Sequence, residues 1–436
     1  MLVQITLRID GREVGTINQQ MKGTAAEMEE QLRPVQQRVG RIVLEHGFDE
    51  LSARTQHPMC CGRSMENRGQ RCRTIQTLSG EVPVQRRQYR CRICGRRVLP
   101  ADEELGFGTH RMTKPLAQRI CQLATLEHFP RLESVLADQH GLHVGHEEML
   151  EVVHAAGGEA ERQRRAETQA WQEVPADRRE WPEPVVTPRC VYVSCDGIMY
   201  CTNQREPDPE HPGGHRLIWQ QMKVGCVYWQ DAQERWHKQM IWGRESPEEF
   251  GAALFRLACQ CGYRQAEERI FAADGADWCW DIHARYFSQA TGILDWYHAS
   301  EHVWNAAHAL HADDPTAKAW AEEALGRLRC HGGDGLVEWL RNQDAHESKR
   351  KRQHLRELLN YLEPRRWCTD YPRYRAAGWQ IGTGMIESTA RQLVGVRLKG
   401  PGMHWTEAGA LAITALRAHD LNGHWHSFWN SLSLAT

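Results

Sequence analysis

Apolar and polar residues alternate along residues 2–18, and an Asp10-Gly11 pair interrupts the alternation. A period of two is typical of a strand with one covered face, and Asp-Gly between two such runs is typical of a tight hairpin turn. From about residue 25 to residue 46 the apolar residues recur every three or four positions, which predicts an amphipathic helix. Residues 1–50 are therefore expected to form a β-hairpin and a helix.

Residues 113–157 have helical apolar spacing in three consecutive stretches, and Gly141 separates the second stretch from the third. A short helix, a glycine-containing turn and another helix are typical of a helix-turn-helix unit. In such a unit the last helix, from about Gly145 to Ala156, would enter a DNA groove. Two glutamates follow His146 at its start and are unfavourable for phosphate contacts, so a plain helical bundle is the alternative interpretation.

The chain from residue 189 onwards has apolar runs that are short enough for strands. Strands are predicted at 189–199, 217–229, 236–242, 269–273 and 292–296, with one helix at 247–261 and another between the last two strands. Three strands, a helix, and then alternating strand and helix is the order of an RNase H-like fold. Residues 300–368 have helical spacing without strand signals, so we expect a helical insertion there.

The length of 436 residues is too large for one ordinary core and predicts about two to four domains. No apolar run approaches the roughly 20 residues that a membrane span requires, and the first residues lack the regions of a secretion signal. We therefore expect a soluble, cytoplasmic protein with no membrane partner. Most of the fifteen cysteines stand singly among apolar residues, as reduced, buried thiols do.

The formal net charge of −2 gives no overall sign of a nucleic-acid partner, but the charge is unevenly distributed. Between Arg54 and Arg97 the chain has eleven arginines and two acidic residues, a local excess of nine positive charges. Such an excess is suited to a polyanion, although a solvated arginine-rich face is the simpler interpretation. A second basic run, Lys349-Arg-Lys-Arg352, could follow DNA phosphates or be a solvated helix face.

One group of cysteines has the spacing of metal ligands, and it flanks a predicted hairpin with a Ser79-Gly80 turn. The second pair is Cys91-Arg-Ile-Cys94-Gly95, and the first part is His57-Pro-Met-Cys60-Cys61-Gly62. Two such turns around a hairpin are typical of a zinc ribbon, because structural zinc takes four nitrogen or sulfur ligands. Adjacent Cys60 and Cys61 could both coordinate only with strain, so we expect one of them to act with His57 or with another residue such as Cys72.

Three carboxylates are candidates for a second metal site. Asp196 and Asp274 each precede a glycine at the end of a strand-like run, and Glu387 lies in the first turn of a downstream helix. Two divalent cations held by such carboxylates activate the attacking oxygen and stabilise the leaving oxygen in displacement at phosphorus. Taken singly, each Asp-Gly is also a common turn, and Glu387 is also favourable at a helix N-terminus. Together they indicate phosphodiester chemistry with two Mg²⁺ or Mn²⁺ ions.

The predicted fold class is therefore multidomain α+β, with an RNase H-like α/β catalytic domain that contains a helical insertion. A zinc ribbon and a helical, helix-turn-helix-like DNA-binding region precede that domain. The expected divisions are a hairpin and helix at 1–50, the zinc ribbon at 51–101, the helices at 102–160, a linker at 161–189, the first catalytic part at 190–299, the insertion at 300–375 and the second catalytic part at 376–436.

Several runs resemble bacterial insertion-sequence transposases of the DDE type, in particular the Kra family, which is related to Mutator-like elements. These runs are Ala272-Ala-Asp274-Gly-Ala, Leu294-Asp-Trp-Tyr-His298, Gly384-Met-Ile-Glu387-Ser and Arg397-Leu-Lys399-Gly-Pro-Gly-Met403-His-Trp405. The resemblance extends from the zinc-ribbon segment to the C-terminus, and the last run is the most specific. One departure is the first cysteine turn, where the family has Cys-x-x-Cys-Gly.

The resemblance implies a nuclease and strand-transfer enzyme that acts on the terminal inverted repeats of its element and on target DNA. It implies a homodimer or larger assembly on DNA in the bacterial cytoplasm, associated with the nucleoid. Carried over by position, the catalytic metal ligands are Asp196, Asp274 and Glu387, and the accessory pair near them is Asp295 and His298. The expected DNA contacts are Arg391, Arg397, Lys399 and Trp405, together with Arg86 and Arg87 of the arginine-rich segment.

Two other functions compete with this interpretation. His298-Ala-Ser-Glu301-His302 has the spacing of inverted zinc metalloproteases, in which two histidines one helical turn apart bind zinc. That motif needs a third ligand and leaves the other acids unexplained. The second alternative is a transposase-derived protein that binds DNA but no longer cuts it.

Overall fold

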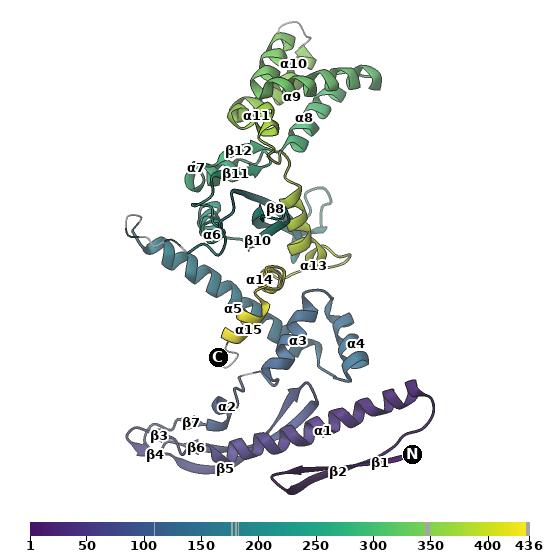
Figure 1. Cartoon of the computed structure of the whole chain (residues 1–436), viewed down its shortest axis with the longest axis vertical. Coiled ribbons are helices and arrows are strands. Elements are labelled where there is room, and N and C mark those ends of the chain that lie inside the picture. The colour runs from purple at the N-terminus through teal and green to yellow at the C-terminus, as the bar shows by residue number, and fades with distance from the viewer. Residues whose placement is uncertain (109, 176–177, 179–180, 182, 345–348, 433–436) are drawn as a thin grey trace. The chain divides into compact units, whose positions relative to one another are not determined.

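The structure is a computed structural model (Figure 1), which describes the whole chain except residues 109, 176–177, 179–180, 182, 345–348 and 433–436. The chain forms two compact units. The first consists of residues 1–161 with 408–436, and the second of residues 162–407. No helix within the described residues is long and apolar enough to cross a membrane.

The first unit begins with the predicted hairpin and helix. Strand β1 (Leu2–Ile9) pairs with β2 (Arg12–Gln20), and α1 spans Ala25–Arg54. Asp10 and Gly11 have φ angles of 49° and 79°, as the turn type favoured in such hairpins requires. Helix α1 starts at a capping box of Thr24 and Glu27 and continues eight residues beyond the predicted end at residue 46.

The cysteine-containing segment is a small β structure, as predicted. Strands β3 (Met59–Cys60) and β4 (Arg63–Ser64) form one pair. Strands β5 (Glu66–Thr77), β6 (Gly80–Arg90) and β7 (Arg97–Val98) form a three-stranded antiparallel sheet, and α2 (Pro100–Glu104) follows. The predicted turn at Ser79-Gly80 joins β5 to β6, and Gly80 has a φ of 100°.

The three predicted helices are α3 (Lys114–Ala124), α4 (Phe129–His140) and α5 (His146–Glu173). Helix α5 extends well past the predicted end at Ala156, so the first part of the predicted linker at 161–189 is helical. Helices α14 (Glu407–Leu421) and α15 (Trp425–Ser431) belong to the first unit, which corrects the assignment of all of 376–436 to the catalytic part. The reason is that α14 is buried along most of its length, and Arg417 donates to the backbone of Thr125.

Helices α5 and α14 approach each other closely at Gly157. A Cβ atom at this position would lie 2.4 Å from the carbonyl oxygen of Ala412, which is backbone and cannot rotate away. We therefore expect Gly157→Ala to destabilise the protein by about 1–3 kcal/mol, as overpacking of a close contact does. The control is Gly326→Ala in helix α9 (Asp314–Asp344), where an added Cβ meets no atom within 4 Å.

The control substitution should stabilise the protein by about 0.5–1 kcal/mol, because alanine favours the helix more than glycine does. Denaturant unfolding of the full chain measures both changes. Equal effects of the two substitutions would contradict the close packing of α5 on α14.

The second unit contains a five-stranded sheet in the order β10-β9-β8-β11-β12. The first three strands, β8 (Cys190–Pro207), β9 (His215–Gln230) and β10 (Trp236–Gly243), pair with one another in antiparallel fashion. Strands β11 (Glu268–Ala273) and β12 (Thr291–Leu294) continue the sheet in parallel with β8. The five predicted strands are therefore confirmed, except that β8 continues eight residues past Met199.

Helices α6 (Pro247–Gln260) and α7 (Asp277–Tyr286) cover one face of this sheet. Alternate residues of β8, including Val191 and Val193, form a core with Phe250 and Leu254 of α6. Each of these side chains is fully buried and contributes about 1.5–3 kcal/mol through burial of apolar surface. Cys195 of β8 belongs to the same core. Because side chains alternate along a strand, the next residue, Asp196, faces the opposite side of the sheet.

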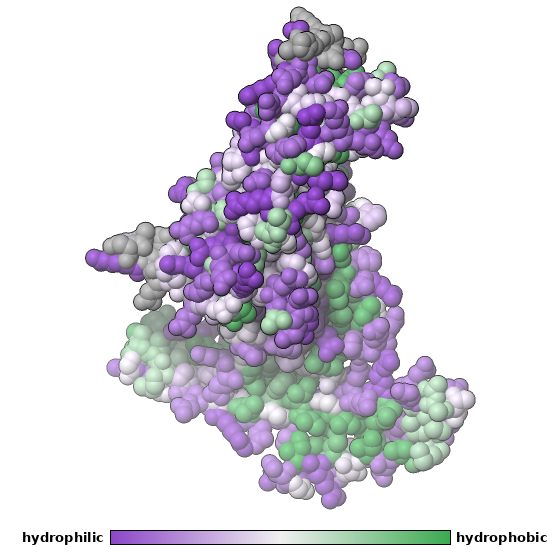
Figure 2. All heavy atoms as spheres, turned by 45° about the horizontal axis from the view of Figure 1, so that its top comes forward, coloured by the Kyte–Doolittle hydropathy of each residue, from purple (hydrophilic) through white to green (hydrophobic). Residues whose placement is uncertain are grey.

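The predicted helical insertion consists of α8 (Trp296–Leu310), α9, α10 (Lys349–Leu362), the 3₁₀ helix η1 (Glu363–Cys368) and α11 (Tyr371–Ala376). Figure 2 shows that hydrophilic residues cover most of its visible face. The chain then continues through α12 (Gly384–Ala390), a π-helical turn η2 (Arg391–Gly395) and α13 (Val396–Leu398).

Candidate active site and metal centre

The three candidate acids come from three different elements of the second unit. Asp196 lies in β8, where it pairs with Val224 of β9, so it is a strand residue and not a turn residue. Asp274 directly follows β11, which is parallel to β8 and adjacent to it. Glu387 lies in the first turn of α12, which packs against β8 and β9. These placements explain how residues distant in sequence meet.

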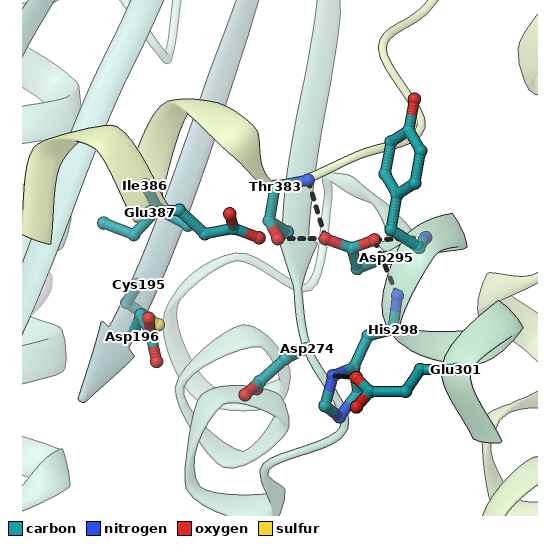
Figure 3. Close-up of a pocket in the computed structure, with 10 residues that line it drawn as sticks. Cys195, Asp196, Asp274, Asp295, His298, Glu301, Thr383, Ile386 and Glu387 are labelled. Atoms are coloured by element: carbon teal, nitrogen blue, oxygen red, sulfur yellow. Dashed lines mark hydrogen bonds and ion pairs between the residues drawn. The ribbon is translucent and has the colours of Figure 1, made fainter. Parts of the chain in front are cut away.

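All three carboxylates line one pocket and are turned toward a common space (Figure 3). The other lining residues are Cys195, Asp295, Tyr297, His298, Glu301, Thr383 and Ile386. The pocket has a volume of about 230 Å³, several times the space that one water molecule occupies. It therefore has room for hydrated ions and a polar ligand.

The acidic side chains of the pocket repel one another. Burial, and then repulsion by Asp274 and Glu387, raise the pKa of Asp196 from 3.8 to about 6, against the opposing effects of the Gly197 N–H and His298. No lysine or arginine occurs among the described residues that line the pocket. Oxygen ligands and negative charge are what Mg²⁺ and Mn²⁺ require, so the residues fit divalent cations.

The raised pKa of Asp196 predicts that the metal-free protein becomes less stable to unfolding as the pH rises. The native state holds the proton of Asp196 more tightly than the unfolded chain does, so this group lowers stability as the pH rises from 3.8 through about 6. We expect Asp196→Asn to stabilise the metal-free protein near neutral pH by about 1–2 kcal/mol, allowing for partial solvent screening. The gain should disappear below pH 3.8.

Thermal unfolding over a range of pH, with chelator and then with Mg²⁺, measures this effect. Added Mg²⁺ should stabilise the wild type more than the variant. Asp281→Asn on the exposed surface of α7 is the control and should change neither the stability nor its pH dependence. An Asp196→Asn protein with wild-type stability at neutral pH would contradict the anionic cluster.

Asp295 is buried, with 2% of its surface exposed, and both oxygens of its carboxylate accept hydrogen bonds. It accepts hydrogen bonds from the N–H groups of Tyr297 at 2.5 Å and His298 at 3.1 Å, and so caps α8. Its other oxygen accepts from the Thr383 N–H at 2.8 Å and from the Thr383 hydroxyl. Asp295 thus fixes the segment before α12 and orients the helix that carries Glu387.

His298 lines the same pocket as Asp295, the residue with which the sequence resemblance pairs it. Its imidazole Nδ1 is 3.9 Å from a carboxylate oxygen of Glu301, and its ring is 5.1 Å from that of His302. The His302 ring stacks on Tyr361 at a centroid distance of 3.7 Å, and burial lowers the pKa of His302. The metalloprotease alternative needs a third ligand beside His298 and His302.

Within the described residues, one group of at least three potential ligands has all its donor atoms within 4.8 Å of one another. That group is four cysteines of the first unit, and it includes neither the histidine pair on α8 nor the three candidate acids. The metalloprotease interpretation of the H-x-x-E-H motif therefore stays an alternative prediction.

The predicted DNA contacts fall into two classes. Arg391 and Lys399 are exposed on the surface of the second unit, as contact with DNA requires. Arg397 and Trp405 are buried, with 2% and 9% of their surfaces exposed, and the guanidinium lies 4.8 Å from the centre of the indole ring. The backbone of Trp405 also bonds to β8 at Cys201. This burial corrects the prediction that Arg397 and Trp405 present their side chains to DNA.

Arg86 is also buried, and it makes two hydrogen bonds of 2.7 and 2.6 Å to the carboxylate of Asp102. The charge of Arg86 is therefore paired with Asp102 inside the first unit, which corrects the predicted contact of Arg86 with DNA. Arg87 is half-buried. Other arginines of the same segment remain exposed on β4 to β7 and the turns between them. They are Arg63, Arg68, Arg71, Arg90, Arg92, Arg96 and Arg97.

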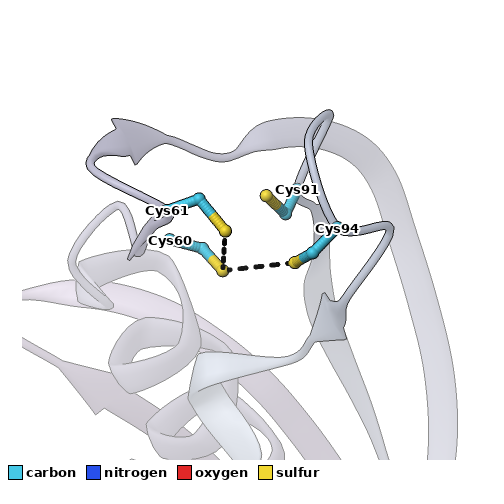
Figure 4. A group of neighbouring side chains, drawn as sticks. All are labelled: Cys60, Cys61, Cys91 and Cys94. Carbon is cyan, nitrogen blue, oxygen red and sulfur yellow. Dashed lines mark hydrogen bonds between the residues drawn. The ribbon is translucent and has the colours of Figure 1, made fainter.

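The four-cysteine cluster of the first unit consists of Cys60, Cys61, Cys91 and Cys94 (Figure 4). The sulfur of Cys60 lies 3.8 Å from that of Cys61 and 3.6 Å from that of Cys94. Tetrahedral zinc with bonds of about 2.3 Å places its sulfur ligands about 3.8 Å apart, so the cluster has the dimensions of a zinc site. Backbone N–H groups of Cys94 and Ile93 lower the pKa of Cys91 to about 6, which favours a thiolate ligand.

Both adjacent cysteines belong to the cluster, whereas the sequence led us to expect one of them. Cys61 adopts a φ of 50°, a conformation that is uncommon for residues other than glycine, and this is the strain that the sequence predicted. His57 is not a member. Its ring bonds to Ser64 at 2.8 Å and packs against Tyr89 at 4.7 Å. Cys72 lies on β5 and is not a member either.

Thr383 is a pocket residue that our sequence analysis missed. It lies in Gly382-Thr-Gly384, directly before the helix of Glu387, and its position before that helix was the available signal. Tyr361 and Arg365 were also missed. They touch the Asp274-Gly275 turn through tertiary contacts, for which the sequence carries no signal.

Comparisons with known proteins do not identify a family. No family model matches the chain, and no curated protein matches it. Among solved structures, the chain is similar to the Drosophila P element transposase strand transfer complex, with 7% identity, 77% of this chain and 84% of that chain covered, and a TM-score of 0.25. At this identity and score the match assigns neither a family nor a fold.

Proposed function

We propose that this protein is a DNA transposase that cuts and joins phosphodiester bonds with Asp196, Asp274 and Glu387. The observation that carries the proposal is that these three carboxylates, from β8, the end of β11 and α12, line one pocket that holds no lysine or arginine among its described residues. The sheet order supports it, because an RNase H-like fold places its first and fourth strands side by side, as β8 and β11 are.

In this proposal the three carboxylates hold two Mg²⁺ or Mn²⁺ ions through their oxygen atoms. Such ions, when bound, activate the attacking oxygen and stabilise the leaving oxygen at phosphorus. Asp295 keeps α12 in place through Thr383, so that Glu387 faces Asp196 and Asp274. His298 lines the same pocket, and a ring N–H of its imidazole would donate a hydrogen bond to a phosphate group placed there.

The first unit supplies DNA binding in this proposal. Zinc held by the four cysteines would fix the turns that carry exposed arginines, and those arginines would contact phosphates. Helices α3 to α5 would add contacts in the manner of a helix-turn-helix unit. The substrate would be the terminal inverted repeats of an insertion sequence of the Kra type, and holding two ends together would require a homodimer or larger assembly.

The test is cleavage of a labelled duplex that carries the presumed element end, taken from the DNA that flanks the gene. We expect binding that weakens with salt, and Mg²⁺- or Mn²⁺-dependent nicking at the end that frees a 3′-hydroxyl. Binding without cutting in either metal would favour the non-cutting, transposase-derived DNA-binding protein. A protein that neither binds nor cuts this duplex would contradict both functions.

A further inference from the structure

The turn that carries Asp274 is held from outside the sheet by the end of the helical insertion. The guanidinium of Arg365, in η1, donates to the carbonyl oxygen of Gly275 at 2.7 Å and to a carboxylate oxygen of Asp277 at 2.6 Å. A third donation, at 2.8 Å, goes to the carbonyl oxygen of Tyr361 in α10. The Arg365 side chain is 13% exposed, so its bonds to the two carbonyl oxygens are partly shielded from water, whereas its partner Asp277 is 91% exposed.

Tyr361 closes the same turn by contact. Its ring lies so near Gly275 that an added Cβ would be 2.4 Å from the Tyr361 Cε2 atom and 3.0 Å from its hydroxyl oxygen. Glycine is therefore required after Asp274 because of this close approach. On its other side the Tyr361 ring stacks on His302 of α8 at 3.7 Å, and the Arg365 guanidinium lies 5.0 Å from the ring centre. The ring is thus held between helices α8 and η1 and the turn.

A second contact ties η1 to the backbone of Asp274 itself. The indole N–H of Trp280, in α7, donates to the carbonyl oxygen of Asp274 at 2.9 Å. Trp367 of η1 packs edge-on against Trp280 at 5.3 Å and lies against Gly292 of β12, where an added Cβ would be 2.4 Å from its ring. Residues of η1 therefore support the backbone at the carbonyl groups of both Asp274 and Gly275.

The side chain of Asp274 receives one local bond, from the Ala276 N–H at 2.9 Å. Its direction into the pocket therefore depends on the backbone of the turn, which Arg365, Tyr361 and Trp367 support from the insertion. We propose that Tyr361 and Arg365 are positioning residues for Asp274, so that the helical insertion controls metal binding at the carboxylate pocket. This inference rests on the proposed metal site.

The test measures Mn²⁺ affinity of the zinc-loaded full chain by calorimetry, which does not depend on DNA cleavage. We expect Arg365→Gln and Tyr361→Ala each to weaken Mn²⁺ binding about tenfold, because each removes a contact that holds Gly275 in the turn after Asp274. Amide exchange at Ala276 should become faster in both. The control is Arg366→Gln in the same 3₁₀ helix, because Arg366 pairs at 3.2 Å with the exposed Asp334 and does not reach the turn.

A double-mutant cycle separates positioning from loss of folding. Gly275→Ala should weaken Mn²⁺ binding in the wild-type background, since its Cβ would displace the Tyr361 ring. In the Tyr361→Ala background the space is free, so Gly275→Ala should cost little more. Additive losses in the cycle would overturn the proposed contact. Unchanged circular dichroism and a cooperative unfolding transition qualify each variant for comparison.

The outcomes distinguish this inference from the proposed function. If the wild type binds Mn²⁺ and cuts DNA but Arg365→Gln and Tyr361→Ala bind Mn²⁺ as Arg366→Gln does, the positioning role is wrong and the proposed function stands. If the wild type binds no Mn²⁺ in the pocket, the proposed function fails and this inference fails with it.

Discussion

If the protein cuts DNA as proposed, Asp274→Asn and Glu387→Gln are each expected to reduce metal-dependent cleavage at least about a thousandfold, with the affinity for DNA within about twofold of the wild type. The reason is that each substitution replaces an anionic oxygen ligand by a neutral amide of the same shape. Binding of two cations at one phosphate needs all three carboxylates, so the loss of either one removes the chemistry and leaves the fold intact. A gel assay of nicking, with a parallel binding assay, measures both quantities.

Asp281→Asn is the matched control for Asp274→Asn, because Asp281 lies nearby on α7 but is exposed and outside the pocket. It should cut DNA like the wild type. Nicking that persists in Asp274→Asn and Glu387→Gln would show that another site or a contaminating nuclease cuts the DNA. Loss of cutting in the control as well would point to a damaged fold.

The elements of both units could largely be predicted from the sequence, because their apolar periodicities are clear. The strands β8 to β12 and the hairpin at the N-terminus follow from alternation and from Asp10-Gly11, which are local properties. The ends of elements were less predictable. Helix α5 continues past Ala156 through charged residues, and only its packing decides where such a helix stops.

The sequence predicted which element carries each candidate acid, because local patterns determine the strands and helices. It did not predict which basic side chains are buried, because that depends on tertiary contacts. Asp196, Asp274 and Glu387 were placed on the correct elements from strand and helix signals. The burial of Arg86 depends on Asp102, sixteen residues away, and that of Arg397 on the ring of Trp405. From sequence alone, a basic residue is assumed to lie on the surface, because the sequence does not show whether a tertiary partner buries its side chain.

The ligands of the cysteine cluster were undecided for a related reason. Adjacent cysteines direct their side chains apart in an extended chain, so one of the two was expected to bind metal. The positive φ of Cys61 brings both sulfurs to the same side. This conformation follows from closure of the turn around the metal-sized cluster, and the sequence of the turn alone does not specify it.

Loss of zinc from the four-cysteine cluster is expected to unfold the turns and strand ends around it and to weaken DNA binding. This part of the segment has a small core of Met65, Tyr89 and Cys91, and Cys91 is itself a member of the cluster, whereas Ile75 and Val84 of β5 and β6 belong to a separate core. Structural zinc contributes about 10–16 kcal/mol to such small sites, far more than a core of this size supplies. Cys91→Ser should therefore yield a chain without bound zinc. The turns around the cluster should be unfolded in this variant, and its DNA binding should be at least about a hundredfold weaker.

Elemental analysis and amide exchange of residues 57–98 measure these effects, and two controls define the ligand set. Cys72→Ser and His57→Ala should retain one zinc ion per chain, because neither residue belongs to the cluster. Zinc loss in His57→Ala together with retention in Cys61→Ser would show a Cys₃His site and contradict the four-cysteine cluster. Cys91→Ser should also keep wild-type Mn²⁺ affinity at the carboxylate pocket, because that pocket lies wholly within residues 162–407. Independent loss of the two metals would assign DNA recognition to the first unit and catalysis to the second.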